Sequence, residues 1–360
     1  MHLQKLSLFN FKNYGETLFE FSPQANCFTG LNGKGKTNVL DAIYYLCMCK
    51  SFFNATDSLN IKHNEVFFTI HGTFTLNENT EDIFCGLKQG HKKVFKRNQK
   101  EYNRLAEHIG LLPVVMVAPV DQELITGGSD ERRKFMDSII CQYDKVYLDD
   151  LTAYQKILQQ RNALLKQMNT QGFFEASSLQ IWDEQLIGYA TRIYATRQRF
   201  VTDFVPLFNR FYQTISSSAE TVDLTYESHL HQPQFEEQLH NALKRDRALQ
   251  YTTVGTHKDD LVFRINQQTA KRFGSQGQQK SVVLALKLAQ FDLLKNARGL
   301  KPVLLLDDVF DKLDETRVSK LMELVSHHTF GQLFITDTNA DRVLNIFKSI
   351  NTTIKNFTLD

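Results

Sequence analysis

The hydrophobic pattern at the start of the chain predicts β-strands. Apolar and polar residues alternate over residues 3–9 and again over 18–21, with a turn-like stretch between the two segments. We therefore expect these two segments to pair as antiparallel strands. Further strand-like runs occupy residues 66–76, 82–88, 92–96 and 112–117.

The middle of the chain has a helical pattern instead. Apolar residues recur in steps of three and four over 147–168 and 182–211, and a polar link with Gly172 separates the two segments. This predicts an antiparallel helical hairpin, each arm of about 25 residues reaching roughly 40 Å. Charged opposite faces favour a projecting coiled-coil arm, while an ordinary helical core stays the alternative. Pro206 is expected to kink or end the second helix.

The last third of the chain alternates strands and helices. Residues 221–227 and 262–266 are strand-like, and 234–249 and 281–296 are helical. Two buried strands are expected at residues 302–306 and 332–336. The pattern predicts an α/β fold with a parallel core sheet. It divides the chain into an N-terminal lobe, a helical arm and a C-terminal completion of the lobe, at residues 1–125, 126–215 and 216–360.

Composition narrows the possible functions only slightly. The 360 residues are 42% hydrophobic and 23% charged, and the net charge of +2 gives no overall electrostatic argument for nucleic-acid binding. The five cysteines lack metal-site spacing and are interpreted as reduced thiols. We expect no signal peptide, because the first strand begins near Met1, and no apolar run is long enough to span a bilayer. The sequence therefore predicts a soluble, cytoplasmic protein without a membrane partner.

A phosphate-binding loop follows the strand predicted at residues 26–29. Its sequence matches G-x-x-x-x-G-K-T between a strand and a helix, with residues Gly30, Leu31, Asn32, Gly33, Lys34, Gly35, Lys36 and Thr37. Glycines let the backbone N–H groups point at phosphate oxygens, and the following helix turns its positive end toward the same anion. We expect this loop to bind a nucleoside triphosphate; the alternative is a glycine-rich surface turn.

Two acids follow the buried strand at 302–306. Asp307 is expected to hold Mg²⁺ together with the hydroxyl of Thr37, and Asp308 is expected to act as general base for the attacking water. The alternative is that these acids only cap the next helix.

A short polar motif precedes the helix at 281–296. A hydroxyl, a glycine and two glutamines at a helix start can form a second anion-binding terminus, but the motif alone is weak. Its residues are Ser275, Gln276, Gly277 and Gln278.

A basic stretch runs from Lys88 to Arg104 and holds seven Lys or Arg against one acid. It is either a solvated hairpin face or a contact surface for the DNA backbone. The candidate DNA contacts are Lys92, Lys93, Lys96, Arg97 and Lys100.

The order of these motifs resembles the ABC-type ATPase heads of the SMC-like group, and within that group the RecF family of bacterial recombination mediators. The resemblance covers residues 3–339 and also rests on segments 11–14, 50–52, 127–137 and 257–261. It implies an ABC-type P-loop head of mixed β-sheets with helices and an inserted helical arm.

The resemblance also implies how such a head works. Two protomers would sandwich two ATP molecules, with Ser275 and Gly277 of one contacting the γ-phosphate at Lys36 of the other. The ATP-dependent homodimer would bind DNA where single- and double-stranded regions meet at gaps, and slow hydrolysis would release it. The family further implies cooperation with RecR and RecO in loading RecA during recombinational repair, replication and the SOS response.

Two departures from the broader ABC pattern are visible. Asp308 stands where a glutamate is usual, and Thr336, Asp337 and Thr338 stand at the end of the last predicted strand, where a switch histidine is usual. Gln122 is a candidate for the glutamine that ABC ATPases place near the Mg²⁺. Two alternatives remain, a transporter nucleotide subunit and a structural SMC-type clamp. The missing histidine and the length of the arm oppose the first, because a transporter subunit would have only a short helical subdomain. The second is opposed because SMC-type clamps have far longer coiled coils than this arm.

Overall fold

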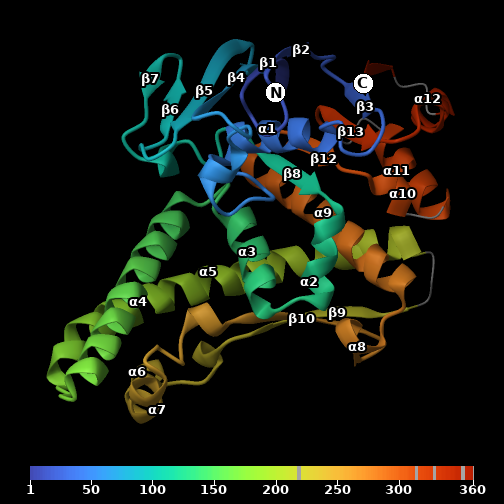
Figure 1. The fold of residues 1–360 in the computed structure, drawn as a ribbon. Coiled ribbons are helices and arrows are strands. Elements are labelled where there is room, and N and C mark those ends of the chain that lie inside the picture. The colour runs from blue at the N-terminus through green and yellow to red at the C-terminus, as the bar shows by residue number, and fades with distance from the viewer. Residues whose placement is uncertain (217–219, 313–314, 327–329, 350–352, 360) are drawn as a thin grey trace. The chain divides into compact units, whose positions relative to one another are not determined.

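In the computed structural model, which describes residues 1–216, 220–312, 315–326, 330–349 and 353–359, five parallel strands form one sheet (Figure 1). Its order is β14-β3-β13-β12-β8. The strands are β3 (Ala25–Thr29), β8 (Val114–Val117), β12 (Val303–Leu306), β13 (Leu333–Asp337) and β14 (Ile354–Thr358). Every residue of the apolar strands β3, β8, β12 and β13 is buried, as expected for a parallel sheet covered on both faces.

A six-stranded antiparallel sheet lies beside it, in the order β2-β1-β4-β5-β6-β7. Its strands are β1 (His2–Phe9), β2 (Glu16–Glu20), β4 (Phe67–Leu76), β5 (Asn79–Lys88), β6 (Val94–Arg97) and β7 (Lys100–Glu101). The predicted pairing of the first two strands is confirmed, with Leu6 opposite Phe19. Helix α1 (Lys36–Met48) contacts strands of both sheets and is buried along nearly its whole length, so it lies inside the core.

These sheets belong to the first of two units, formed by residues 1–122, 210–218 and 276–360. The long helix α9 (Gln276–Arg298) packs against β8, and the C-terminal part adds the helices α10 (Val309–Lys312), α11 (Glu315–Ser326) and α12 (Ala340–Ser349). Short 3₁₀ turns at Asp57–Asn60, Leu105–Glu107 and Pro119–Gln122 complete this unit.

The second unit takes residues 123–209 and 219–275. Its helices are α2 (Glu123–Thr126), α3 (Ser129–Ile140), α4 (Lys145–Gln171), most of α5 (Ser177–Ser216), α6 (Phe235–Asn241), α7 (Leu243–Leu249) and α8 (Ala270–Phe273). A three-stranded antiparallel sheet joins β9 (Val222–Glu227), β10 (Asp260–Ile265) and β11 (Gln268–Thr269). The division into segments 1–125, 126–215 and 216–360 stays a prediction, since each unit is assembled from discontinuous stretches of chain.

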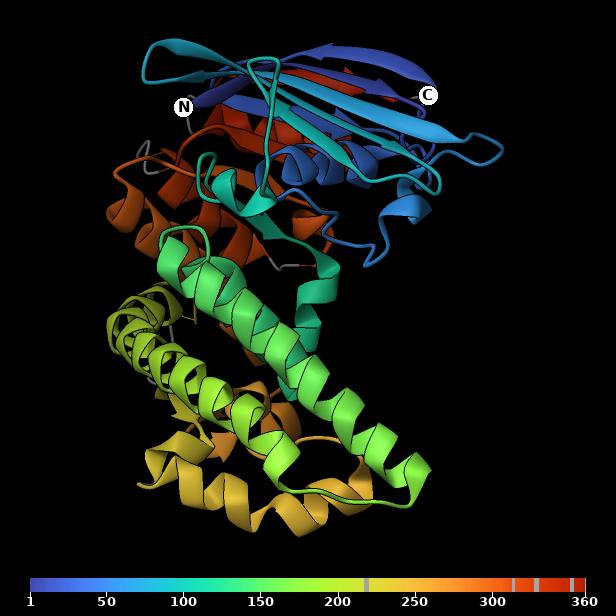
Figure 2. The same cartoon turned by 90° about the vertical axis from the view of Figure 1, so that its left-hand side faces the viewer.

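The predicted helical hairpin is present. Helices α4 and α5 run side by side in opposite directions, and five residues link them (Figures 1 and 2). Helix α5 continues through Pro206 to Ser216, so the proline does not end it, although it leaves the carbonyl one turn earlier without a backbone donor. The helix expected over 234–249 is two short helices, α6 and α7, that meet at Ala242. No helix among the described residues is long and apolar enough to cross a membrane.

Arg161 is a charged residue in the apolar face of α4, and its ion pairs explain its position there. Arg161 is fully buried, and its guanidinium donates to Asp183 of α5 at 2.5 Å and to Asp246 of α7 at 2.7 Å. Asp246 is itself fully buried and also accepts from the hydroxyl of Thr253 at 2.6 Å. One cation therefore ties three helices of the second unit together.

We expect Arg161→Met to lower the free energy of unfolding by about 3–5 kcal/mol, because it leaves the Asp246 carboxylate buried without its cation. The matched control is Arg192→Met, which removes a pair with Asp150 that also joins α4 to α5 but whose guanidinium side chain is 53% exposed. The control should cost less than about 1 kcal/mol. Urea unfolding followed by circular dichroism measures both, and equal losses would contradict the structural role of Arg161.

Candidate nucleotide site

Three neighbouring strands of the parallel sheet end at the candidate site. The phosphate-binding loop follows β3, Asp307 follows β12, and Thr336 lies near the end of β13. Asp307 accepts hydrogen bonds from the hydroxyls of Thr37 and Thr336, each at 2.8 Å. Two motifs that are 270 residues apart in sequence thus meet at one carboxylate.

Two glycines of the loop each combine a positive φ with a close neighbouring atom. Gly30 has φ 145°, and a Cβ there would lie 2.3 Å from the carbonyl oxygen of Leu359. Gly35, at the N-cap of α1, has φ 97°, and a Cβ there would lie 2.5 Å from the side-chain amide of Asn13. Larger residues at either position would therefore be strained and would clash with neighbouring atoms.

Lys36 is almost fully buried in this loop. Its ammonium group donates to the carbonyl oxygens of Gly30 at 2.8 Å and Leu31 at 3.0 Å. The lysine is therefore curled against the loop, at the start of α1, where a cation and a helix N-terminus act on the same anion.

The turn at 10–15 supports the loop from behind. The side chain of Asn13 donates to the carbonyl of Lys34 at 3.4 Å and accepts from the side chain of Asn38 at 2.7 Å. The hydroxyl of Tyr14 donates to the carbonyl of Gly35 at 3.1 Å. The sequence analysis used these two residues only as marks of a resemblance, and their local pattern gave no sign of this supporting contact.

The electrostatics of the site centre on Asp307, which is 4% exposed. Burial raises the pKa of this carboxyl, and the hydrogen bonds from Thr336 and Thr37 oppose that rise. A buried carboxylate beside a hydroxyl supplies the hard oxygen donors that Mg²⁺ prefers, so these residues fit that ion.

Thr336 contacts both acids of the site, a role that its position in the sequence did not predict. Besides its bond to Asp307, its hydroxyl oxygen accepts from the backbone N–H of Asp308 at 2.9 Å. Asp308 has a positive φ of 47°, a conformation that aspartate adopts more readily than most residues. The threonine therefore fixes both acids, at the place where a switch histidine was sought.

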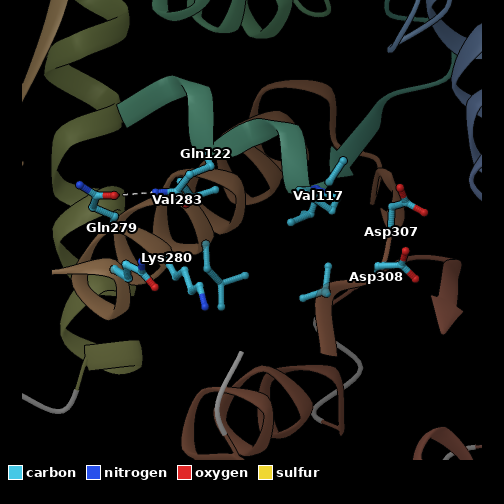
Figure 3. Close-up of a pocket in the computed structure, with 12 residues that line it drawn as sticks. Val117, Gln122, Gln279, Lys280, Val283, Asp307 and Asp308 are labelled. Atoms are coloured by element: carbon cyan, nitrogen blue, oxygen red, sulfur yellow. Dashed lines mark hydrogen bonds between the residues drawn. The ribbon is translucent and has the colours of Figure 1, made fainter. Parts of the chain in front are cut away.

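Two cavities meet at Asp308. One, of about 310 Å³, is lined by the phosphate-binding loop and Asp308; its residues are Asn32, Gly33, Gly35, Lys36, Thr37, Asn38 and Asp308. The other, of about 460 Å³, lies between the end of β8, the start of α9 and the two acids (Figure 3). Gln122 and Gln279 face each other across part of it and share a hydrogen bond of 2.8 Å.

The predicted signature residues mark the start of α9. Gln276, Gly277 and Gln278 form its first turn, and Ser275 directly precedes the helix at the end of the second unit. Gly277 leaves room for Arg317, whose guanidinium would lie 3.3 Å from a Cβ at this position. Arg317 also donates to the hydroxyl of Ser281 at 2.7 Å. Gln276 lines the larger cavity, and the residues that line the loop cavity include none of the four.

The five predicted DNA contacts divide into two groups. Lys93 is largely buried and donates to Asp57 at 2.7 Å and to the carbonyl of Cys49 at 2.6 Å, and Arg97 forms a two-pronged ion pair with Glu81. These two cations hold the hairpin to the rest of its unit. Lys92 and Lys100 are exposed, and Lys96 lies half-exposed on the outer side of the sheet.

The motif at 257–261 has a structural place in the second unit. Asp259 accepts at 2.7 Å from Arg197, which is 2% exposed, and Asp260 forms a two-pronged pair with Arg132. Burial lowers the pKa of His257 to about 4, so this imidazole is neutral at physiological pH and is held by Tyr154. The motif therefore ties β10 to α3, α4 and α5.

We expect Asp307→Asn to keep the stability of the fold while weakening the binding of metal. Because the carboxyl has a raised pKa in the folded protein, its contribution to stability is greatest below its ordinary pKa of 3.8 and is lost as the pH rises through the raised value. At neutral pH the buried charge therefore costs stability, and asparagine removes that cost while still accepting from Thr37 and Thr336.

The melting temperature of the nucleotide-free variant should thus equal or exceed that of the original protein at pH 7. Its Mg²⁺-dependent gain in nucleotide affinity should fall about tenfold or more, or about 1.4 kcal/mol. Thermal unfolding and titration calorimetry with and without Mg²⁺ measure the two effects. A variant that melts much earlier, or that keeps the full Mg²⁺ effect, would contradict this role.

Comparison with known proteins agrees with the geometry. A family model described as the RecF/RecN/SMC N terminal domain matches residues 2–357. The chain is 52% identical over 359 residues to the DNA replication and repair protein RecF of Flavobacterium johnsoniae, covering 100% of both chains. It is 48% identical to the protein of the same name from Phocaeicola vulgatus, covering 100% of this chain and 97% of the relative.

Solved structures give the same result. The structure of a recombination mediator protein RecF with ATP superimposes with a TM-score of 0.87 at 33% identity, covering 94% of this chain and 92% of that one. An Smc head bound to the C-winged helix domain of ScpA gives a TM-score of 0.57 at 16% identity, with 96% and 92% covered, and is similar in fold alone. The predicted α/β ABC-type head with an inserted helical arm is thus confirmed, and the chain belongs to the RecF family of DNA replication and repair proteins.

Proposed function

We propose that this chain is an ATP-dependent DNA-binding protein whose two copies join when each holds ATP and Mg²⁺. The observation that carries the proposal is the 2.8 Å hydrogen bond between Thr37 and Asp307, which unites the phosphate-binding loop with the predicted metal ligand. The solved RecF structure with ATP, at a TM-score of 0.87, supports the same ligand for this site.

Each residue of the loop has a part in this binding. Backbone N–H groups of residues 30–37 and the start of α1 receive the phosphates, and Lys36 exchanges its contacts with the Gly30 and Leu31 carbonyls for the β- and γ-phosphates. Thr37 and Asp307 hold Mg²⁺, which when bound neutralises part of the phosphate charge.

The second half of the site comes from another copy. The loop cavity has no wall from Ser275, Gln276, Gly277 or Gln278 of its own chain. That arrangement supports binding in trans, where the first turn of α9 of one copy meets the γ-phosphate held by Lys36 of the other. ATP then acts as a bridge that joins the two copies.

Asp308 serves as the general base in slow hydrolysis. It lines the loop cavity, and its backbone is fixed by the hydroxyl of Thr336. Its side chain is one methylene shorter than the glutamate usual in ABC ATPases, so the carboxylate reaches less far toward an attacking water. Gln122, held by Gln279, is the proposed glutamine that senses the metal.

The nucleic-acid partner is gapped DNA, at junctions of single and double strands. Membership of the RecF family supports this, as does a solved relative described as part of a RecFOR pathway. On the same basis we assign cooperation with RecR and RecO in loading RecA, a part in the SOS response, and a cytoplasmic location. Light scattering with and without ATP, on gapped and on blunt duplex DNA, tests the proposal, and a protein that stays monomeric with ATP on both would refute it.

Two substitutions separate the two halves of the nucleotide site. Lys36→Met should abolish ATP binding and ATP-driven dimerisation together, because it removes the cation for the phosphates. Ser275→Arg should keep the ATP affinity of the monomer within about twofold, yet block dimerisation by placing a bulky cation at the joint. Calorimetry and light scattering measure the two properties. Loss of nucleotide by the Ser275 variant would show that the assignment to the partner copy is wrong.

Asp308→Asn should bind ATP and still dimerise, but hydrolyse it about 10²–10⁴-fold more slowly, the usual contribution of a general base. Dimers should therefore persist on DNA after free ATP is removed. Phosphate release and the dissociation rate from labelled gapped DNA measure this outcome, and unchanged turnover would exclude Asp308 as the base.

A further inference from the structure

The outer face of the six-stranded sheet carries aromatic side chains. The opposite face is closed by buried residues such as Leu3, and Gly72 lies directly against Leu46 of α1. On the outer face, Phe9 and Phe67 stack with ring centroids 5.6 Å apart and planes at 21°. Phe67 is 37% exposed, although a solvent-facing sheet position is usually polar.

A third ring lies flat on the same face. Phe84 leans over Gly86, where a Cβ would lie 3.2 Å from the ring, so the glycine makes the space that the ring occupies. The ammonium group of Lys96, on the neighbouring strand, lies 6.0 Å from the centre of this ring. Phe84 is therefore half-buried, with a cation over its ring.

The register of β4 and β5 places these groups in one surface. Phe67 is opposite Lys88, and Phe84 stands two residues before Gly86 and four before Lys88, so all point to the same side. Lys88 is exposed, as is Lys92 in the turn that follows.

Four acids share this face with the rings, and two of them are held in ion pairs. Glu20 pairs with Lys5, and Asp82 pairs with His71. Glu16 stands opposite Phe9, and Glu101 stands opposite Lys96. Among the cations, Lys88 stands opposite Phe67 and Lys96 stands opposite Phe84.

We propose that this aromatic face, formed by Phe9, Phe67, Phe84, Lys88 and Lys96, binds unpaired nucleotides of single-stranded DNA. Bases stack on Phe67 and Phe84, and the phosphates lie near Lys88 and Lys96. Base stacking on exposed rings is tolerant of sequence, and a duplex cannot use it because its base faces are already stacked. The inference rests on the proposed function, and it names the surface that receives the single-stranded side of a gap.

The test compares affinities of the full chain for a fluorescent oligo(dT) and for a blunt duplex at one salt concentration. Phe67→Ala and Phe84→Ala should each weaken oligo(dT) binding about tenfold while leaving duplex binding and ATP binding unchanged. The control is Phe173→Ala, which removes a 64% exposed ring in the second unit and should change neither affinity. Melting temperatures confirm that the variants fold.

A gain-of-signal variant keeps the proposal falsifiable if an alanine variant unfolds. Phe67→Trp should bind oligo(dT) like the original chain, and its fluorescence should be quenched by stacked bases, beyond any quenching of the single native Trp182. Normal oligo(dT) affinity in both alanine variants, or no extra quenching, would overturn the aromatic face and leave the proposed function intact. An original chain that binds neither DNA in the presence of ATP and Mg²⁺ would instead refute the proposed function.

Discussion

The structure of the nucleotide site depends on one buried carboxylate. Asp307 follows β12 and accepts hydrogen bonds from Thr37 at the start of α1 and from Thr336 of β13, each at 2.8 Å. Strand β13 lies between β3 and β12 in the sheet. Carboxyl ends of parallel strands lie at the same edge of a sheet, so residues far apart in sequence converge there without long loops. The hydrophobic strands are therefore what makes the polar site possible.

Burial of the charged Asp307 carboxylate lowers the stability of the fold, and this cost favours the binding of a cation. The raised pKa of Asp307 shows that the folded protein holds this charge in a poorly solvated place. Lys36 is a nearby cation that favours the charged form. A divalent ion at the same place relieves that cost more strongly than two hydroxyl donors can. The site is thereby arranged so that ligand binding also stabilises the fold around it.

Much of this could be predicted from the sequence, because the informative signals are local. The phosphate-binding loop, the two acids and the apolar strands can each be recognised within a stretch of ten residues. That the loop and the acids form one site follows from the order of the strands in the sheet. Thr336 could not be found in this way, since its value lies only in being next to Asp307 after folding. Lys93 was misleading for the same reason, because a lysine in a basic stretch looks solvated until its distant partner, Asp57, is known.

Under the proposed function, the position of the signature residues makes the site depend on a second copy. Asp308 lines both cavities, whereas Gln276 lines only the larger one and the loop cavity is formed by residues 32–38 and that acid. The loop cavity has a volume of about 310 Å³, and none of the signature residues of the same chain line it. Water then competes with every phosphate contact until another surface covers the γ-phosphate, because electrostatic interactions strengthen only when solvent is excluded. Under the proposed function, nucleotide affinity and subunit association become two aspects of one equilibrium, and the shorter side chain of Asp308 slows the reaction that would end the association.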